Sequence, residues 1–161
     1  MYAGRKSIAP FVASPLAVVR MMLKYANLKP GESLYDLGSG DGRIVLMAAK
    51  EFGANAVGVE LNKRLMEEAV KKSEVIEVEG KARFIHGNIF DADLSQADVI
   101  TMYLTTGAND KVRPKLEDEL KLGARIVTHD FSIPSWKHSE SFKLKEGYRH
   151  HTIYLYIIGA L

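Results

Sequence analysis

Several features that often point to a function are missing from this chain. It contains no cysteine, which excludes disulfide bonds, thiolate metal sites and thiol nucleophiles. It has no uncharged apolar run of about eighteen residues, so no membrane-spanning helix is expected. The N-terminal segment MYAGRKSIAPFVASP lacks the apolar centre and small-residue cleavage site of a signal peptide. We therefore expect a soluble, cytoplasmic protein without a membrane partner.

A large excess of charge of one sign is missing too. The net charge is +2, and basic residues are interleaved with acidic ones, as in RLMEEAVKKSEVIEVEGK. This mixture is typical of a solvated surface, so stable binding to nucleic acid is not expected. With 47% apolar residues in 161, the chain can bury about two-thirds of its unfolded surface. We expect residues 1–161 to form a single domain that acts as a monomer.

Strand and helix patterns alternate along most of the chain. Strands are predicted at SLYDLG, NAVGVEL, ARFIHG, ADVITMYL and ARIVTHDF. Alternating β and α units favour parallel strands with right-handed crossovers, and hence a doubly wound α/β sheet. After Trp136 two extended runs, ESFKLKE and HHTIYLYIIG, follow each other without a helix, which predicts an antiparallel pair.

Capping residues predict where the helices begin and end. Ser14 is expected as the N-cap of the first helix, with Pro15 at its first position. Gly53 is expected to end the second helix in a left-handed conformation, and Asn62 to cap the third. The fourth helix is predicted in NDKVRPKLEDELKLG at least from Pro114, which suits a first helical turn because proline lacks an N–H.

The segment YDLGSGDGR places three glycines, Gly38, Gly40 and Gly42, directly after a predicted strand. Glycine allows positive φ angles and lets another molecule approach the backbone closely. In doubly wound sheets, ligands bind beyond the carboxyl ends of the strands. The segment therefore predicts a ligand site.

An acidic residue at the tip of the next strand indicates which ligand binds there. Glu60 is placed to accept hydrogen bonds from both ribose hydroxyls, which favours an adenosine-containing ligand. A dinucleotide motif would have its third glycine at position 43, where this chain has Arg43. Asp36 and Asp41 would repel a pyrophosphate but attract an ammonium and a sulfonium group. The charges favour S-adenosylmethionine over NAD.

The blocks DLGSGDGR and GVELN resemble the cofactor site of the Rossmann-like (class I) S-adenosylmethionine-dependent methyltransferases. With PFVASP upstream and FSIPSW downstream, the chain is similar to the small archaeal protein lysine methyltransferases. It is also similar to the eukaryotic mitochondrial lysine methyltransferases of the adenine nucleotide carrier and the ATP synthase c subunit. This resemblance implies a seven-stranded sheet of order 3-2-1-4-5-7-6, with strand 7 antiparallel and helices on both faces. It also implies that residues 1–26 form an N-terminal lid segment and helix over the cofactor.

The resemblance further implies S-adenosylmethionine as the cofactor, S-adenosylhomocysteine as the product, and a set of contacts. The methionine part is expected at Asp36, Gly38, Ser39, Gly40 and Asp41. The ribose is expected at Glu60, with Leu61 and Asn62 following at the ring edge, and the adenine is expected at Asn88 and Ile89. Phe11, Val12, Ser14 and Tyr103 complete the expected cofactor contacts. Asn88 stands where many such enzymes have Asp, so its contact with adenine should be weaker.

Aromatic residues are the candidates for the substrate side. Tyr103, Phe131 and Trp136 follow the fourth and fifth predicted strands, where aromatic faces would attract a cation and exclude water. Tyr103 is favoured because the residue that ends the fourth strand faces the transferable methyl group in this fold. Each of the three is as well explained by packing in the core or at the rim. Thr105 and Thr106 are expected at the same rim.

The histidines give weaker indications. His129 and Asp130 could be a base and its orienting carboxylate, but adjacent strand residues point to opposite faces, which argues against the pair. His150 and His151 are predicted to lie in a strand. His86 and His138 have no partners at metal-ligand spacing, so no metal site is expected.

Three functions remain open from the sequence. Broadly selective N-methylation of accessible protein lysines is the leading hypothesis. Methylation of RNA or of a small molecule by the same machinery is the second, and a non-catalytic nucleotide-binding domain is the third. The segment YLTT stands where enzymes that methylate base amines or glutamine amides have N/D-P-P-Y/F/W, which disfavours those two substrates.

Overall fold

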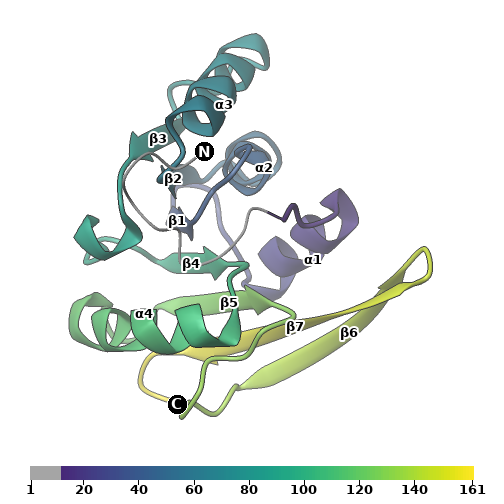
Figure 1. Cartoon of the computed structure of the whole chain (residues 1–161), viewed down its shortest axis with the longest axis vertical. Coiled ribbons are helices and arrows are strands. Elements are labelled where there is room, and N and C mark those ends of the chain that lie inside the picture. The colour runs from purple at the N-terminus through teal and green to yellow at the C-terminus, as the bar shows by residue number, and fades with distance from the viewer. Residues whose placement is uncertain (1–11) are drawn as a thin grey trace.

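The computed structural model describes residues 12–161, and a seven-stranded sheet lies at its centre (Figure 1). The strands are β1 Ser33–Leu37, β2 Asn55–Glu60, β3 Ala82–His86, β4 Val99–Met102, β5 Arg125–His129, β6 Glu140–Glu146 and β7 Arg149–Ile157. Their order is β3-β2-β1-β4-β5-β7-β6. The strands from β1 to β5 pair in parallel, whereas β7 is antiparallel to both β5 and β6. The expected order and the antiparallel seventh strand are confirmed.

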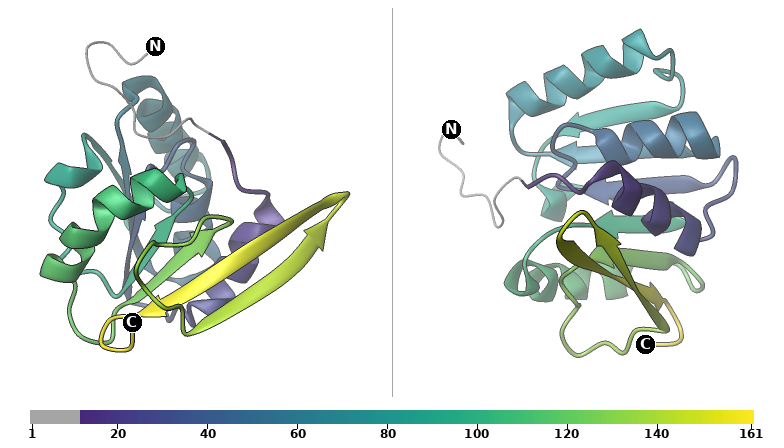
Figure 2. Two further views of the ribbon diagram at one scale, coloured as in Figure 1. Left: turned by 60° about the horizontal axis from the view of Figure 1, so that its bottom comes forward. Right: turned by 90° about the vertical axis from the view of Figure 1, so that its right-hand side faces the viewer.

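Helices cover both faces of the sheet. They are α1 Leu16–Tyr25, α2 Arg43–Phe52, α3 Lys63–Val75 and α4 Thr106–Glu119, with a short 3₁₀ turn at Ile89–Asp91. The first three helices lie side by side along one face, and α4 lies on the other (Figure 2). None of the helices described between residues 12 and 161 combines the length and the apolar character needed to cross a membrane.

The core consists of two apolar layers separated by the sheet. One layer packs α1 and α2 against the sheet and includes Val19, Leu23 and Val45. The other packs α4 against the opposite face and includes Val112, Leu116 and Ile126. All four residues of β4 are buried, as expected for a parallel strand that is covered on both faces. The carboxyl ends of the parallel strands lie together at one edge of the sheet, which we call the open edge.

Two of the predicted helix ends are confirmed. Gly53 follows α2 with a left-handed φ of 69°, and the backbone N–H of Ala54 donates to the Ala48 carbonyl at 3.1 Å. The Asn62 side chain accepts hydrogen bonds from the backbone N–H groups of Arg64 and Leu65 at the start of α3.

Two predicted helix starts are wrong. Pro15, not Ser14, occupies the N-cap position of α1, and the helix begins at Leu16 without a side-chain cap. Ser14 does not cap because its hydroxyl shares a hydrogen bond with His129. In α4, Pro114 lies inside the helix, which begins at Thr106. The Thr105 hydroxyl accepts from the backbone N–H of Ala108 and so caps α4 well before the proline.

Candidate active site

The three glycines form the turn between β1 and α2, and all three have positive φ. The φ angles are 81° at Gly38, 57° at Gly40 and 83° at Gly42, and residues other than glycine rarely adopt such angles. The backbone N–H groups of Gly38 and Ser39 both donate to the carbonyl of Val59 in β2. These bonds hold the turn against the neighbouring strand.

Close packing gives a second reason for glycine around this turn. A Cβ on Gly42 would lie 2.8 Å from the Cβ of Ala69 in α3 and 2.9 Å from the Phe84 ring. A Cβ on Gly58 in β2 would lie 2.6 Å from Ser39. The turn between β1 and α2 is therefore packed closely against β2, β3 and α3, which leaves no room for a side chain at Gly42 or Gly58.

Glu60 lies beside this turn, as predicted. Its Oε1 accepts from the backbone N–H of Gly40 at 2.8 Å, and its Oε2 accepts from that of Asn62 at 2.7 Å. The residue is 6% exposed. Two backbone donors orient the carboxylate, and each oxygen keeps a further lone pair for a ligand hydroxyl.

Asp36 is the next-to-last residue of β1, two positions before the glycine turn, and it is 2% exposed. Its Oδ1 accepts from the hydroxyl of Thr101 in β4 at 2.9 Å. Burial, together with the nearby carboxylates of Glu60 and Asp41, raises the pKa of Asp36 to about 8. Asp36 is therefore protonated at neutral pH in the protein without ligand, whereas the sequence argument treated it as a carboxylate. Thr101 is a site residue that sequence reasoning missed, because only the pairing of β1 with β4 places it opposite Asp36.

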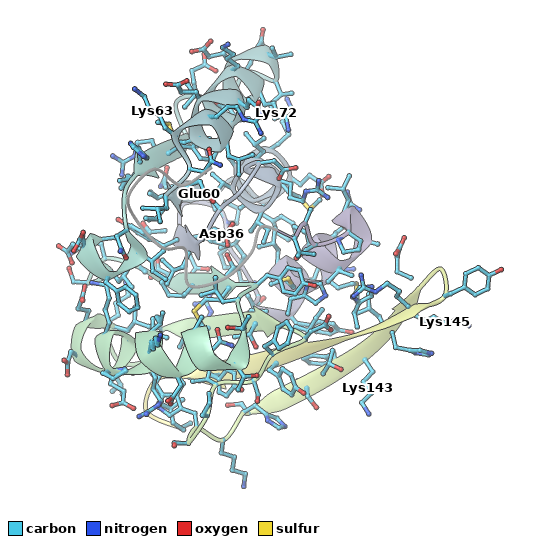
Figure 3. The ribbon with its side chains drawn as sticks, in the orientation of Figure 1. Asp36, Glu60, Lys63, Lys72, Lys143 and Lys145 are labelled. Atoms are coloured by element: carbon cyan, nitrogen blue, oxygen red, sulfur yellow. The ribbon has the colours of Figure 1, made fainter. Side chains whose placement is uncertain are left out.

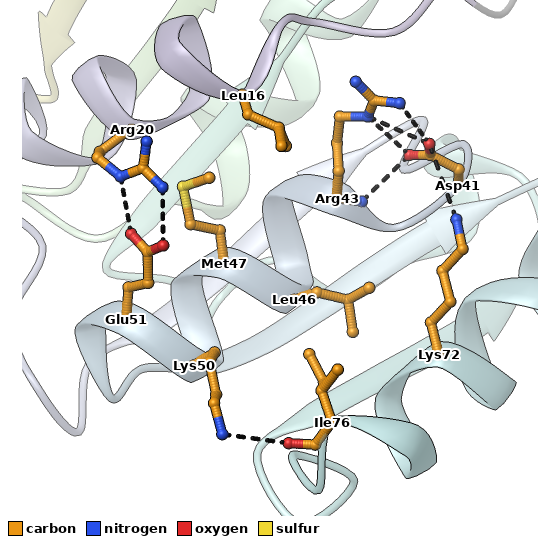
Figure 4. Close-up of a pocket in the computed structure, with 10 residues that line it drawn as sticks. All are labelled: Leu16, Arg20, Asp41, Arg43, Leu46, Met47, Lys50, Glu51, Lys72 and Ile76. Atoms are coloured by element: carbon orange, nitrogen blue, oxygen red, sulfur yellow. Dashed lines mark hydrogen bonds and ion pairs between the residues drawn. The ribbon is translucent and has the colours of Figure 1, made fainter.

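Asp41 points to the outer face of α2, where Figure 4 shows it bonded to Arg43 and facing Lys72. The guanidinium Nη2 of Arg43 lies 2.7 Å from Oδ2 of Asp41, and the Nζ of Lys72 lies 4.0 Å from the same oxygen. Burial raises the pKa of Asp41, but the hydrogen bonds from Arg43 outweigh it and hold that pKa below its usual value. Its negative charge is thus already paired, which weakens its expected attraction for a cationic ligand.

The residues expected around the ribose and adenine lie at the ends of β2 and β3. The Leu61 carbonyl accepts from the Nε2 of His86 at 3.0 Å, and Asn62 caps α3. The side-chain oxygen of Asn88 accepts from the backbone N–H of Phe90, and Ile89 is buried in the core. Asn88 thus forms a turn within its own segment and has one lone pair left for adenine.

Two of the three candidate aromatic residues lie together. The Tyr103 ring follows β4 directly and is stacked on His129 at a centroid distance of 4.0 Å, and its centroid lies 6.2 Å from that of Phe131. Phe131 is 37% exposed. Trp136 packs elsewhere: it donates its Nε1–H to Glu117 of α4 at 2.8 Å and contacts the Tyr156 ring. The geometry favours Tyr103 and Phe131 as the aromatic wall of a site, and explains Trp136 by packing.

A buried polar chain lies behind Tyr103. The hydroxyl of Ser14 and Nδ1 of His129 are 2.8 Å apart, and Nε2 of His129 and Nδ1 of His151 are 2.8 Å apart. Burial lowers the pKa of His129 to about 4, so the ring is neutral at pH 7. Whichever tautomer is present, the chain ends at Nε2 of His151, which is buried without a partner among residues 12–161. Sequence reasoning missed the roles of Ser14 and His151 because they depend on contacts between distant segments.

Asp130 joins this cluster, contrary to the sequence argument. β5 ends at His129, and Asp130 has a left-handed φ of 62°, so its side chain turns back toward the preceding ring. Its Oδ2 lies 3.5 Å from Nε2 of His129 and 3.8 Å from Nδ1 of His151. These three donor atoms are close enough to hold a metal ion. However, the two rings already bond to each other, so the cluster is held together without an ion.

The N-terminal lid contacts are described only in part. Phe11 lies outside the described residues, as does most of the expected lid segment. Val12 is 51% exposed, whereas Ser14 is buried and bonded to His129. The guanidinium of Arg43 also donates to the backbone carbonyl of Ser14 at 3.0 Å. Ser14 therefore links the segment before α1 to both α2 and β5.

The fold and the site together define a class of protein. The sheet order, the glycine turn after β1 and the acidic residue that ends β2 are those of the class I methyltransferases. A solved structure with this architecture, an RNA methyltransferase from Salinibacter ruber in complex with S-adenosyl-L-homocysteine, aligns with a TM-score of 0.87. It is 40% identical and covers 91% of this chain and 94% of its own.

Within that class, the chain belongs to the ANTKMT methyltransferase domain family, whose model matches residues 36–140. A protein-lysine N-methyltransferase from Saccharolobus islandicus is 46% identical over 93% of this chain and 94% of its own length. The human lysine N-methyltransferase of the ATP synthase c subunit is 34% identical over 83% of this chain, which spans only 57% of that relative. The family expected from the sequence is confirmed.

Proposed function

We propose that this protein is a lysine N-methyltransferase, which transfers a methyl group from S-adenosylmethionine to the ε-amino group of accessible lysines on other proteins. The observation that carries the proposal is the 46% identity with an archaeal protein-lysine N-methyltransferase over nearly the full length of both chains. We also propose broad selectivity among exposed lysines, because Phe131 beside Tyr103 is partly exposed to solvent.

The residues beside the glycine turn fit S-adenosylmethionine. Ser39 Oγ is buried and lacks a hydrogen-bond partner among the described residues, so it is free to bond to a ligand. Glu60 offers its remaining lone pairs to the ribose hydroxyls. When bound, this cofactor supplies an electrophilic methyl group on a positively charged sulfur. A positive charge beside Asp36 would lower the pKa of that side chain and favour its carboxylate.

The substrate side of the site must favour loss of a proton from the target lysine's ammonium group and must also position its nitrogen for methyl transfer. A free lysine has a pKa near 10.4, so its neutral form at pH 7 costs about 4.6 kcal/mol. Tyr103 and Phe131 offer aromatic faces that attract the ammonium group, and their apolar surroundings favour loss of its proton to solvent. The rings then limit the approach of the nitrogen to one direction, which is the placement that methyl transfer requires.

Incubation with S-adenosylmethionine labelled in its methyl group tests the proposed function. A mixture of folded proteins and RNA is treated with the wild-type chain, and label is measured in the protein and RNA fractions. We expect label on lysine side chains, located by mass spectrometry, and none with Glu60→Gln. Calorimetry with S-adenosylhomocysteine shows whether that variant fails because it no longer binds the cofactor. Label confined to RNA would contradict the proposal.

RNA methylation is the second candidate, and one observation favours it. The Salinibacter ruber structure, 40% identical to this chain, is described as an RNA methyltransferase. Against it, the net charge of +2 and the mixed surface give little attraction for a polyanion. The same labelling experiment separates the two candidates, because the fractions are counted independently.

A further inference from the structure

The β6–β7 hairpin extends past the open edge of the sheet. β7 pairs with β5 only from Ile153 onward, so residues 149–152 and their partners 143–146 in β6 lie beyond the end of β5. At about 3.3 Å per residue, this extension is roughly 13 Å long. Figure 1 shows the yellow hairpin running beyond the arrowhead of β5. We call residues 143–152 the hairpin arm.

The hairpin arm is attached directly beside the aromatic wall of the site. The backbone N–H of Asp130 donates to the Thr152 carbonyl at 2.7 Å, and the backbone N–H of Thr152 donates to Oδ1 of Asp130 at 3.0 Å. Asp130 immediately precedes Phe131. In the hairpin, Thr152 pairs in register with Lys143. Thr152 of β7 thus lies between Lys143 of β6 and Asp130, the residue that precedes Phe131.

Alternation along β6 turns its lysines away from the core. The Phe142 ring is stacked on the Tyr25 ring of α1 with 3.4 Å between the ring centroids. Leu144 packs against the apolar layer that contains α1 and α2. The side chains between and after them, Lys143 and Lys145, therefore occupy the opposite face of the strand. Both are exposed, and Figure 3 shows them projecting from the hairpin.

The cations of the hairpin arm have no partners within the described chain. Lys143, Lys145 and Arg149 are all exposed, and none forms an ion pair with a residue between 12 and 161. Glu146 is the one acidic residue within residues 143–152. Lysines on an edge strand often prevent aggregation. That role explains Lys143 and Lys145, but not Arg149 on β7 or the pairing of Lys143 with Thr152, which is bonded to Asp130 beside the aromatic wall.

We propose that the hairpin arm is a docking surface that favours target lysines with acidic residues nearby. The inference rests on the proposed lysine methylation and names its substrate class. A target lysine arrives as a cation, so a cationic surface repels it unless neighbouring carboxylates offset the charge. In an extended substrate, an acidic residue three to five positions from the lysine lies about 10–17 Å away, which matches the length of the hairpin arm.

Peptide kinetics test this docking surface. Three peptides carry the same central lysine, flanked at three to five positions by acidic, neutral or basic residues, and are compared with wild type and with Lys143→Glu/Lys145→Glu. We expect wild type to have the lowest KM for the acidic peptide, and the double variant to raise that KM about tenfold with kcat unchanged. Raising the salt from 50 to 500 mM should reduce the wild-type preference, because exposed charges are screened.

A matched control separates docking from general charge. Lys24→Glu/Lys71→Glu makes the same change in net charge at exposed positions on α1 and α3, and should leave the peptide preference intact. Unchanged affinity for S-adenosylhomocysteine shows that each variant is folded, and the wild-type salt titration tests the docking surface even if a variant does not fold. Transfer to all three peptides with one KM, in wild type and variant alike, would overturn docking while leaving lysine methylation established. If the double variant loses methyl transfer to RNA but keeps transfer to the peptides, the hairpin arm binds RNA. That result would also overturn the proposed docking surface for acidic peptides.

Discussion

The two halves of the open sheet edge are built in different ways. The half around β1, α2 and β2 is held by contacts between residues close in sequence, such as the bond from Gly40 to Glu60. The half around β4, β5 and β7 is held by contacts across most of the chain, such as the bond between Ser14 and His129. A short segment therefore specifies the glycine turn and its contact with Glu60, while the second half depends on the complete fold.

This difference has a functional counterpart. The first half offers backbone groups, buried carboxyl groups and glycines, which suit one invariable ligand. The second offers exposed aromatic rings and the cationic hairpin arm, which suit variable partners. The proposed lysine methylation needs one surface for the cofactor and one for the substrate, and these two kinds of surface lie in different halves of this edge of the sheet.

The largest expected effect is a loss of stability when the packing around β1, α2 and β2 is disturbed. Gly58→Ala would place a Cβ 2.6 Å from Ser39 and 2.9 Å from Phe84, which should lower the free energy of unfolding by about 3 kcal/mol. Gly80→Ala is the matched control, because a Cβ there has no neighbour within 4 Å. Denaturant unfolding measures both. Equal stability of the two variants would show that the first half is not tightly packed.

The second prediction concerns Asp36, whose pKa of about 8 lies well above its ordinary value of 3.8. A raised pKa means that the folded state holds a proton that the unfolded state has lost. The resulting stability is complete below pH 4 and is lost as the pH rises toward 8, at up to about 1.4 kcal/mol per pH unit. Unfolding measured from pH 5 to 8 should show this slope in wild type and a smaller one in Asp36→Asn.

The same group predicts how cofactor affinity depends on pH. A cationic ligand favours the Asp36 carboxylate, so S-adenosylmethionine should bind more tightly as the pH rises from 6 to 8 and should release a proton on binding. Calorimetry in buffers of different ionisation enthalpy detects that proton. Asp36→Asn should bind weakly and without proton release. If Asp36→Asn also released a proton on binding S-adenosylmethionine, the proton would come from a group other than Asp36.

A smaller effect should distinguish the aromatic residues of the second half. Phe131→Ala removes a ring of the aromatic wall and should lower kcat/KM about tenfold, with little change in affinity for S-adenosylhomocysteine. Trp136→Phe loses only the bond to Glu117 and should keep kcat/KM within about twofold of wild type. Steady-state kinetics on one protein substrate measures both. A greater loss at Trp136 would place that residue in the site as the sequence suggested.

The smallest expected effect is at Ser14. Ser14→Ala leaves Nδ1 of His129 buried without its partner, which should cost about 1 kcal/mol of stability. Because the hydroxyl is engaged by His129, affinity for S-adenosylhomocysteine should change less than about threefold, a difference under 1 kcal/mol. Ser14→Thr retains a hydroxyl and serves as the control. A larger loss of affinity in Ser14→Ala would support the cofactor contact expected from the sequence.

The first half was predictable because its geometry is local. Gly38, Gly40 and Gly42 all have positive φ angles, as the glycine pattern suggested, and Glu60 ends β2 next to them, as its place after the predicted strand suggested. Strand length and glycine conformation follow from neighbouring residues, so a motif of about 25 residues carries the information. The ionisation of Asp36 was not predictable, because it depends on burial by the complete sheet.

By itself, the sequence determined the order of strands and helices, the glycine turn and the acidic residue beside it. Only the tertiary structure decided that Ser14 bonds to His129, that Asp130 turns back toward its neighbour, and that the hairpin arm extends beside Phe131. These features depend on which distant segments become neighbours and on the register in which β5 and β7 pair. Register and long-range contact come from packing of the whole chain, and short sequence motifs do not encode them.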